Sequence, residues 1–209
     1  MRGAASGAGA GSGGGEGVDT RQRGTDKFRE REEPERGMIT TEYVATMARY
    51  NAWQNGNVIA VLDGMDESEL RAGRGAFFGS ILATLNHVLW GDRTWMARLA
   101  GWKAPAGGIP ESVDFAPTYA AWRAERVRVD GRLVHWADTL RPAQLRGELG
   151  WYSAALGRDV RKPIALCVVH LFNHQTHHRG QVHAMLTAAG RDPGGPLADT
   201  LTDVLQALG

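Results

Sequence analysis

The sequence contains a single cysteine, Cys167, in 209 residues. One thiol cannot form an intramolecular disulfide, so a disulfide-stabilised secreted domain is excluded and a reducing compartment is expected. No apolar run approaches the roughly 20 residues that a membrane-spanning helix needs. The N-terminus lacks the apolar segment of a secretory signal. We therefore expect a cytoplasmic protein with no membrane partner.

The sequence also lacks an excess of charge of either sign. Lys and Arg number 24 against 23 Asp and Glu, which gives a formal net charge of +1. Proteins that bind nucleic acid or anionic membranes usually carry a basic surface, so neither partner is expected. The hydrophobic content of 43% and the charged content of 22% are ordinary for a globular protein.

Residues 1–37 differ in composition from the rest of the chain. The run "GAASGAGAGSGGGEG" is rich in Gly, Ala and Ser, and a mixed-sign charge run follows it. Neither segment has the apolar residues that a packed core requires. We expect 1–37 to be a flexible tail and 38–209 to form one folded domain.

Four segments of the domain show the helical spacing of apolar residues at intervals of three and four. Thr40 or Thr41 is a candidate N-cap for the first helix, Ser80 for the second, and Gly101 is a candidate stop for the second. The four segments are residues 40–62, 80–101, 118–140 and 163–190.

The connections between these segments are also informative. Residues 63–75 form a polar break, and residues 102–117 form a long loop with three prolines. Residues 144–163 alternate in polarity and contain a Gly-Arg-Asp turn signal, which predicts a short β-hairpin or an extended crossover. Residues 197–208 predict a short C-terminal helix. The expected fold is all-α, a four-helix bundle with a long connection between the second and third helices.

Five of the seven histidines lie in "HLFNHQTHHRGQVH", residues 170–183. At about 100° per residue, His174 and His178 fall in the middle of the apolar stripe of their helix. His170 and His177 lie on one flank of the stripe, and His183 lies on the opposite face, where solvent is expected. The stripe itself is made by Cys167, Leu171, Val182 and Met185.

Two histidines one turn apart that both face a core are costly without a partner. A divalent metal can satisfy both, because an i, i+4 pair presents two imidazole nitrogens together. The alternative is a hydrogen-bonded core pair. The pattern is not that of a zincin protease, because Gln175 stands where that motif has a glutamate as general base.

Two histidines rarely complete a metal site, and only His87 and His135 remain elsewhere in the chain. His135 lies among charged residues and is expected at the surface. His87 lies on the flank of a widely apolar helix, and Gly91 one turn later would leave room beside it. The spacing favours His87 only weakly.

The segments "TLNHVLWGDRTWMARLAG" and "NHQTHHRGQVHAML", with the opening "YNAWQNGNVIAVLDGM", resemble the DinB/YfiT-like family of metal-dependent enzymes. The resemblance extends from about Met38 to the end of the chain. It implies a four-helix bundle with an unusual connection between the second and third helices. It also implies a divalent metal, zinc or nickel, on His87, His174 and His178. Relatives include bacillithiol- and mycothiol-dependent transferases and isomerases, and family members are often homodimers.

Three neutral histidines with an open fourth position are typical of a catalytic metal site. The expected function is that of a metal-dependent enzyme acting on a small molecule, as a hydrolase or as an S-transferase for a low-molecular-weight thiol. The alternatives are a non-catalytic metal- or ligand-binding bundle and a haem or other cofactor bundle. The sequence assigns no catalytic residue and does not name the substrate.

Three further expectations concern the surroundings of the histidines. Gln181 is expected to orient a ligand or substrate, or to make an interhelical hydrogen bond. Arg179 is expected to pair with a carboxylate such as Asp92. Three polar residues of the first helix are candidates for the mouth of a pocket: Tyr50, Asn51 and Asn57.

Overall fold

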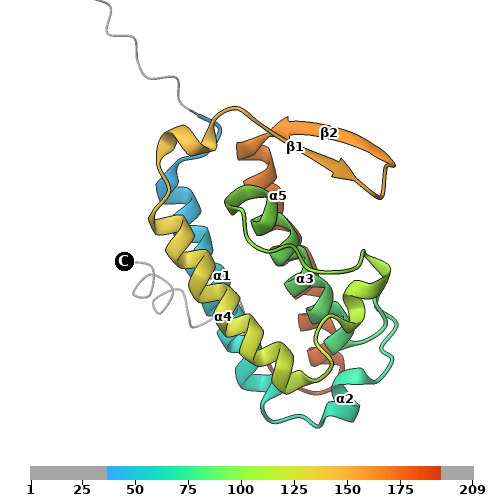
Figure 1. The fold of residues 1–209 in the computed structure, drawn as a ribbon. Coiled ribbons are helices and arrows are strands. Elements are labelled where there is room, and N and C mark those ends of the chain that lie inside the picture. The colour runs from blue at the N-terminus through green and yellow to red at the C-terminus, as the bar shows by residue number, and fades with distance from the viewer. Residues whose placement is uncertain (1–36, 194–209) are drawn as a thin grey trace, which may run out of the picture. The chain divides into compact units, whose positions relative to one another are not determined.

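The computed structural model describes residues 37–193. Its four long helices form a bundle in which α1 packs against α4 and α3 packs against α5 (Figure 1). The predicted four-helix bundle is confirmed. The helices are α1 (Thr41–Leu62), α3 (Ile81–Ala100), α4 (Tyr119–Asp138) and α5 (Ile164–Ala188).

Local capping explains where these helices begin and end. The hydroxyl of Thr40 accepts a hydrogen bond from the backbone N–H of Tyr43, and that of Ser80 accepts one from Ala83. Thr118 caps α4 in the same way. At the end of α3, Gly101 adopts φ 66°, a left-handed conformation that glycine takes without strain.

The connections contain more structure than the sequence predicted. The polar break holds a short helix, α2 (Glu67–Arg71), and the long loop between α3 and α4 holds a 3-10 helix, η1 (Pro110–Asp114). A second 3-10 helix, η2 (Pro142–Leu145), follows α4. The short helix α2 is held against the bundle by Leu70, which is fully buried in the core.

The predicted hairpin is confirmed. Strands β1 (Glu148–Ser153) and β2 (Arg158–Pro163) pair antiparallel, with Trp151 opposite Val160. The hairpin lies at the end of the bundle where α5 begins (Figure 1). The expected flexible tail and the expected C-terminal helix over residues 197–208 lie outside the described residues.

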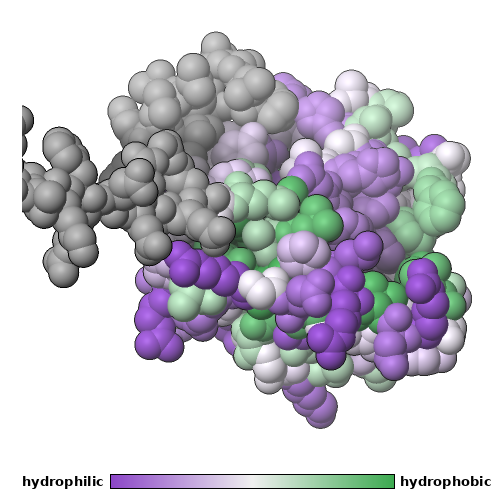
Figure 2. Space-filling view, turned by 90° about the horizontal axis from the view of Figure 1, so that it is seen from above, coloured by the Kyte–Doolittle hydropathy of each residue, from purple (hydrophilic) through white to green (hydrophobic). Residues whose placement is uncertain are grey.

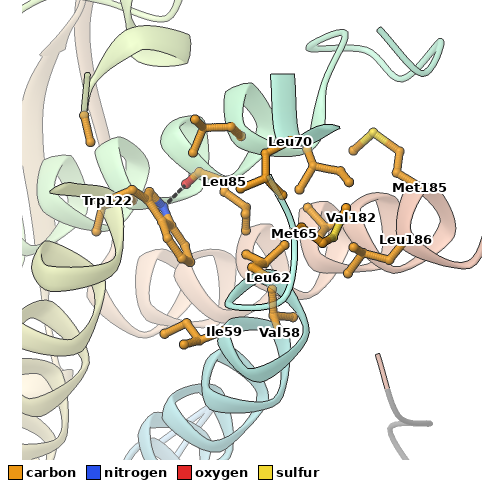
Figure 3. Packing of buried hydrophobic residues seen from close by; sticks show 14 of the residues in the cluster. Val58, Ile59, Leu62, Met65, Leu70, Leu85, Trp122, Val182, Met185 and Leu186 are labelled. Carbon is orange, nitrogen blue, oxygen red and sulfur yellow. Dashed lines mark hydrogen bonds between the residues drawn. The ribbon is translucent and has the colours of Figure 1, made fainter. Parts of the chain in front are cut away.

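Two apolar clusters form the core, one toward each end of the bundle. In the first cluster, side chains from α1, α3, α4 and α5 meet, and the Nε1–H of Trp122 donates to the carbonyl of Leu85 at 3.0 Å (Figure 3). On the face shown in Figure 2, hydrophilic and apolar residues are interspersed. Within residues 37–193, no helix combines the length and the apolar character that crossing a membrane requires.

A layer of buried polar side chains separates the two apolar clusters along the helices. At its centre Arg126 of α4 pairs with Asp92 at 2.5 Å and with Asp130 at 2.7 Å. Gln175 donates to the other oxygen of Asp92 at 2.7 Å, and Asn55 donates to Asp130 at 3.0 Å. The layer therefore joins all four long helices at the level of the histidines.

The prediction that Arg179 pairs with a carboxylate such as Asp92 was wrong. Arg179 is buried and donates to the amide oxygen of Asn51 on α1, while Asp92 is hydrogen-bonded to Arg126 and Gln175. The helical angle of Arg179 directs it toward α1, away from α3, where Asp92 lies. Burial lowers the pKa of Arg179 to about 10, although the nearby charge of Asp92 opposes that shift.

Candidate metal centre

Three imidazoles from two helices converge at the level of the polar layer. His87 comes from α3, and His174 and His178 come from α5. One ring nitrogen of each lies within 4.8 Å of the others, and the Nε2 atoms of His87 and His174 are 3.1 Å apart. The structure therefore brings together the three histidines that we predicted as metal ligands. Their role as ligands stays a prediction.

The orientation of His87 is set by a residue far away in the sequence. Its Nδ1 lies 2.8 Å from the hydroxyl oxygen of Ser112, and that hydroxyl donates its only proton to the carbonyl of Ile109 at 2.6 Å. The hydroxyl must therefore accept from Nδ1–H of His87. This tautomer leaves the lone pair of Nε2 facing the other two histidines, as metal binding requires.

Gln181 plays the same part for His178. The side-chain oxygen of Gln181 lies 2.8 Å from Nδ1 of His178, and His178 precedes Gln181 by one turn of α5. A hydrogen bond from Nδ1–H to this oxygen leaves Nε2 as the free donor atom. Of the two roles expected for Gln181, the geometry favours that of orienting a ligand.

His174 occupies space that a glycine leaves open. A Cβ at Gly91 would lie 2.8 Å from Cε1 and 3.3 Å from Nδ1 of His174, closer than side chains pack. Gly91 thus admits His174, whereas the sequence suggested that it makes room beside His87. Nδ1 of His174 is buried and has no hydrogen-bond partner among the described residues.

All three imidazoles are held in the neutral form that binds a metal. Burial lowers the pKa of His87 to about 4 and that of His174 to about 3, and neighbouring histidines contribute to both shifts. Burial also lowers the pKa of His178. Near neutral pH each ring therefore offers a lone pair.

The remaining histidines do not join the cluster. His170 and His177 are exposed on the flank, and His135 is exposed on α4, as predicted. The prediction for His183 was wrong, because this residue is half-buried and lines a separate cavity of about 280 Å³ between α1 and α5. The turn of α5 that carries His183 packs near α1, which the helical angle alone does not show.

The polar residues of α1 also lie away from the histidines. Tyr50 and Asn57 line the same separate cavity as His183. Asn51 is buried in the polar layer, where it contacts Asp130 and Arg179. The expectation that these three residues line the mouth of the histidine pocket was therefore wrong.

Sequence reasoning missed Phe78, which covers the histidines from the loop between α2 and α3. Its ring stacks on His87 with 4.0 Å between centroids and lies 5.5 Å from the ring of His178. Gly75 and Gly79 flank it with φ values of 72° and 84°, so the loop bends through conformations suited to glycine. The paired phenylalanines in "RGAFFGS" are the only signal in the sequence.

A cavity of about 740 Å³ opens beside His87 and His174. One wall is α3, and the others are the loop after α3, the hairpin and the start of α5. The lining includes the aromatic side chains of Trp90, Trp95 and Trp151. A volume of this size is typical of small-molecule sites, which lie between about 300 and 1,000 Å³.

Comparison with known proteins supports this description. The model of the DinB family matches residues 38–202. A search of curated proteins found no match. Among solved structures, the chain resembles YfiT from Bacillus subtilis, described as a probable metal-dependent hydrolase with an unusual four-helix bundle topology, with a TM-score of 0.54 and 15% sequence identity. The match covers 76% of this chain and 94% of YfiT, and at this identity it shows a shared fold. Because the family model matches more than half of the chain, the chain belongs to the DinB family.

Proposed function

We propose that this protein is a metal-dependent enzyme that acts on a small molecule, with the metal held by His87, His174 and His178. The observation that carries the proposal is the convergence of three neutral imidazoles whose candidate ligand atoms lie within 4.8 Å of one another. Ser112 and Gln181 hold the outer nitrogens of two of them, which is the usual support for metal-bound histidine.

The chemistry of this donor set fits a divalent ion. Three neutral nitrogen ligands favour zinc, nickel or a related ion and leave its 2+ charge uncompensated. With a fourth position open, such an ion supplies Lewis-acid chemistry and lowers the pKa of a water or thiol that reaches it. His87 and His174 line the cavity, so a small molecule in it would lie beside an ion held by these histidines.

Two reactions are consistent with such a site. Attack by an activated water gives a hydrolase, the activity in the description of YfiT. A thiol ionised at the metal would be the nucleophilic thiolate, and its displacement of a leaving group from the second substrate would make the protein an S-transferase. In both, Phe78 and the tryptophans of the cavity wall would limit the access of bulk water to the reacting groups.

A non-catalytic metal- or ligand-binding bundle is the second candidate. One observation favours it: none of the described residues that line the cavity is Asp or Glu, so no carboxylate is placed there as general base. In that case the ion would stabilise the bundle, and its removal would lower the melting temperature sharply.

The absorption spectrum of the cobalt-loaded protein tests the proposal. An open position predicts that the visible bands change when a small thiol such as 2-mercaptoethanol, or azide, is added. The His178→Ala variant should lack the bands, and His177→Ala should retain them. Bands that do not respond to either added ligand would indicate a closed site and favour the non-catalytic bundle.

The location and the oligomeric state of the protein are proposed from the sequence. We propose that the protein is cytoplasmic, because it has a single cysteine. We also propose that it is a homodimer, because members of the family often are. Light scattering of the purified chain tests the oligomeric state. A monomer at micromolar concentration would contradict the homodimer without affecting the metal site.

A further inference from the structure

Arg98 lies in the cavity beside the histidines, clamped between two tryptophans. Its guanidinium carbon is 4.8 Å from the ring centroid of Trp95 on α3 and 5.1 Å from that of Trp151 on β1. The two indole rings meet edge to face, with centroids 5.4 Å apart. A strand and a helix thus fix the position of this cation, and contacts of this kind hold a planar guanidinium in one orientation.

No anionic partner accompanies this cation. No hydrogen bond or ion pair joins Arg98 to any residue in the described part of the chain. Arg98 is the single Lys or Arg among the described residues that line the cavity, and Asp and Glu are absent from that lining. The five N–H groups of the guanidinium are therefore available to an acceptor that enters the cavity.

Some other buried or half-buried arginines of the chain do have carboxylate partners. Arg126 is fully buried and meets two aspartates, and Arg93 is half-buried and pairs with Glu125. Arg98 is half-buried as well, and burial lowers its pKa. A partly desolvated cation without a carboxylate gains the most from an anion that binds beside it.

The cavity connects Arg98 to the histidines. Arg98 follows His87 by eleven residues on α3, which corresponds to about 16 Å along the axis. The side chain leans back over Trp95, toward the start of the helix, so the gap that a ligand must bridge is shorter. Between the two ends the cavity wall offers the rings of Trp90 and Trp95.

We propose that Arg98 binds a carboxylate of the substrate, so that the cavity takes an elongated small molecule with an apolar middle. The carboxylate meets the guanidinium, the middle lies on the tryptophans, and the reactive end reaches the histidines. The placement of the reactive end rests on the proposed metal-dependent function. The anion site at Arg98 does not, and it can be tested without metal.

The test compares two probes of equal length, octanoate and 1-octanol. Their dissociation constants for the metal-free full chain are measured by ligand-detected NMR. Octanoate should bind about tenfold more tightly than 1-octanol, because only the carboxylate forms a charge-assisted pair with Arg98. The Arg98→Met variant, which keeps an apolar side chain of similar length, should bind both probes about equally.

Arg132 provides the matched control, because its guanidinium carbon also lies over a tryptophan, 3.8 Å from the ring centroid of Trp102, but outside the cavity. Arg132→Met should leave the preference for octanoate unchanged. Arg98→Lys retains the charge without the planar fork and should keep part of the preference, which provides a second variant if Arg98→Met does not fold. Equal binding of both probes by the wild type, or an unchanged preference in a folded Arg98→Met, would overturn the proposal.

A second pair of probes separates this proposal from the metal site. With zinc present, 8-mercaptooctanoate should bind more tightly than octanoate, because its thiol reaches the histidines. If the thiol adds nothing while the carboxylate preference persists, the placement of the reactive end at the histidines fails and the anion site stands. If the thiol adds affinity but the carboxylate does not, the anion site fails and the metal proposal stands.

Discussion

The imidazole of His174 packs against the bare Cα of Gly91, so closely that a Cβ on this glycine would lie 2.8 Å from Cε1 of the ring. Gly91 lies inside α3, where glycine normally weakens a helix by about 1 kcal/mol relative to alanine. The glycine stands where a side chain on α3 would clash with the imidazole of His174.

The variant Gly91→Ala should therefore lose metal affinity, by about 10- to 100-fold, because His174 must rotate away from the other two ligands. Metal competition with a chromophoric chelator measures the change. Gly131→Ala is the control, since a Cβ there meets nothing within 4 Å. It should raise the free energy of unfolding by up to about 1 kcal/mol and leave the metal affinity unchanged. Equal metal affinity in both variants would show that His174 is not a ligand.

Removing the hydroxyl of Ser112 should weaken metal binding while leaving the three histidines in place. In Ser112→Ala, Nδ1–H of His87 loses its acceptor, and the ring is no longer held with Nε2 toward the cluster. Metal affinity should fall by about 10- to 100-fold, as is usual when such a support is lost. Thr176→Val serves as control, because its hydroxyl binds only the carbonyl of Phe172 within its own helix. The idea fails if the two variants bind zinc with the same affinity.

The polar layer should matter for stability more than any surface ion pair. Arg126→Met leaves Asp92 and Asp130 buried without their cation, and such a loss typically costs about 3–5 kcal/mol. Arg128→Met breaks a half-exposed pair with Glu125 and should cost less than about 1 kcal/mol. Urea unfolding of both variants measures the difference. Similar midpoints for the two would contradict a buried, paired Arg126.

Protonation of the cluster should destabilise the metal-free protein. The pKa of His87 falls from its ordinary 6.5 to about 4 on folding, so the unfolded chain binds more protons between these values. The free energy of unfolding should therefore decrease as the pH falls from 6.5 toward 4, by an amount on the order of 3 kcal/mol for this one group. The loss is complete only near pH 4, where the folded form also takes up the proton.

Urea unfolding at a series of pH values measures this dependence. In His87→Gln the decrease should be shallower than in the wild type, since glutamine does not titrate. His135→Gln changes an exposed histidine and should reproduce the wild-type dependence. An identical pH dependence for the wild type and His87→Gln would contradict the burial of a neutral imidazole at position 87.

Much of the fold could be predicted because the signals are local. Thr40, Ser80 and Gly101 mark helix ends through hydrogen bonds and dihedral angles within a few residues of themselves. The inward direction of His174 and His178 follows from the regular angle of one helix. The helical angle does not show which neighbouring helix a side chain meets, and for this reason the partner of Arg179 and the place of His183 were missed.

The parts of the site that depend on loops could not be predicted. Ser112 and Phe78 reach His87 from segments whose path is set by packing, and no periodicity links them to the histidine. His87 itself was assigned by family resemblance, because α3 is buried over most of its surface and its inward direction is poorly defined. The anion site at Arg98 needs a strand and a helix together, so the sequence of either one alone does not reveal it.

The central claim is that three particular histidines hold one divalent ion. Elemental analysis of the purified full chain, loaded with zinc and dialysed, tests it most directly. We predict about one equivalent of zinc per chain in the wild type. Zinc should be lost from His87→Ala, His174→Ala and His178→Ala. It should be retained by alanine variants of the other histidines of α5, namely His170, His177 and His183. Retention of zinc by the first three variants, or its loss from the His170 or His177 variant while His178→Ala keeps it, would contradict the proposed site.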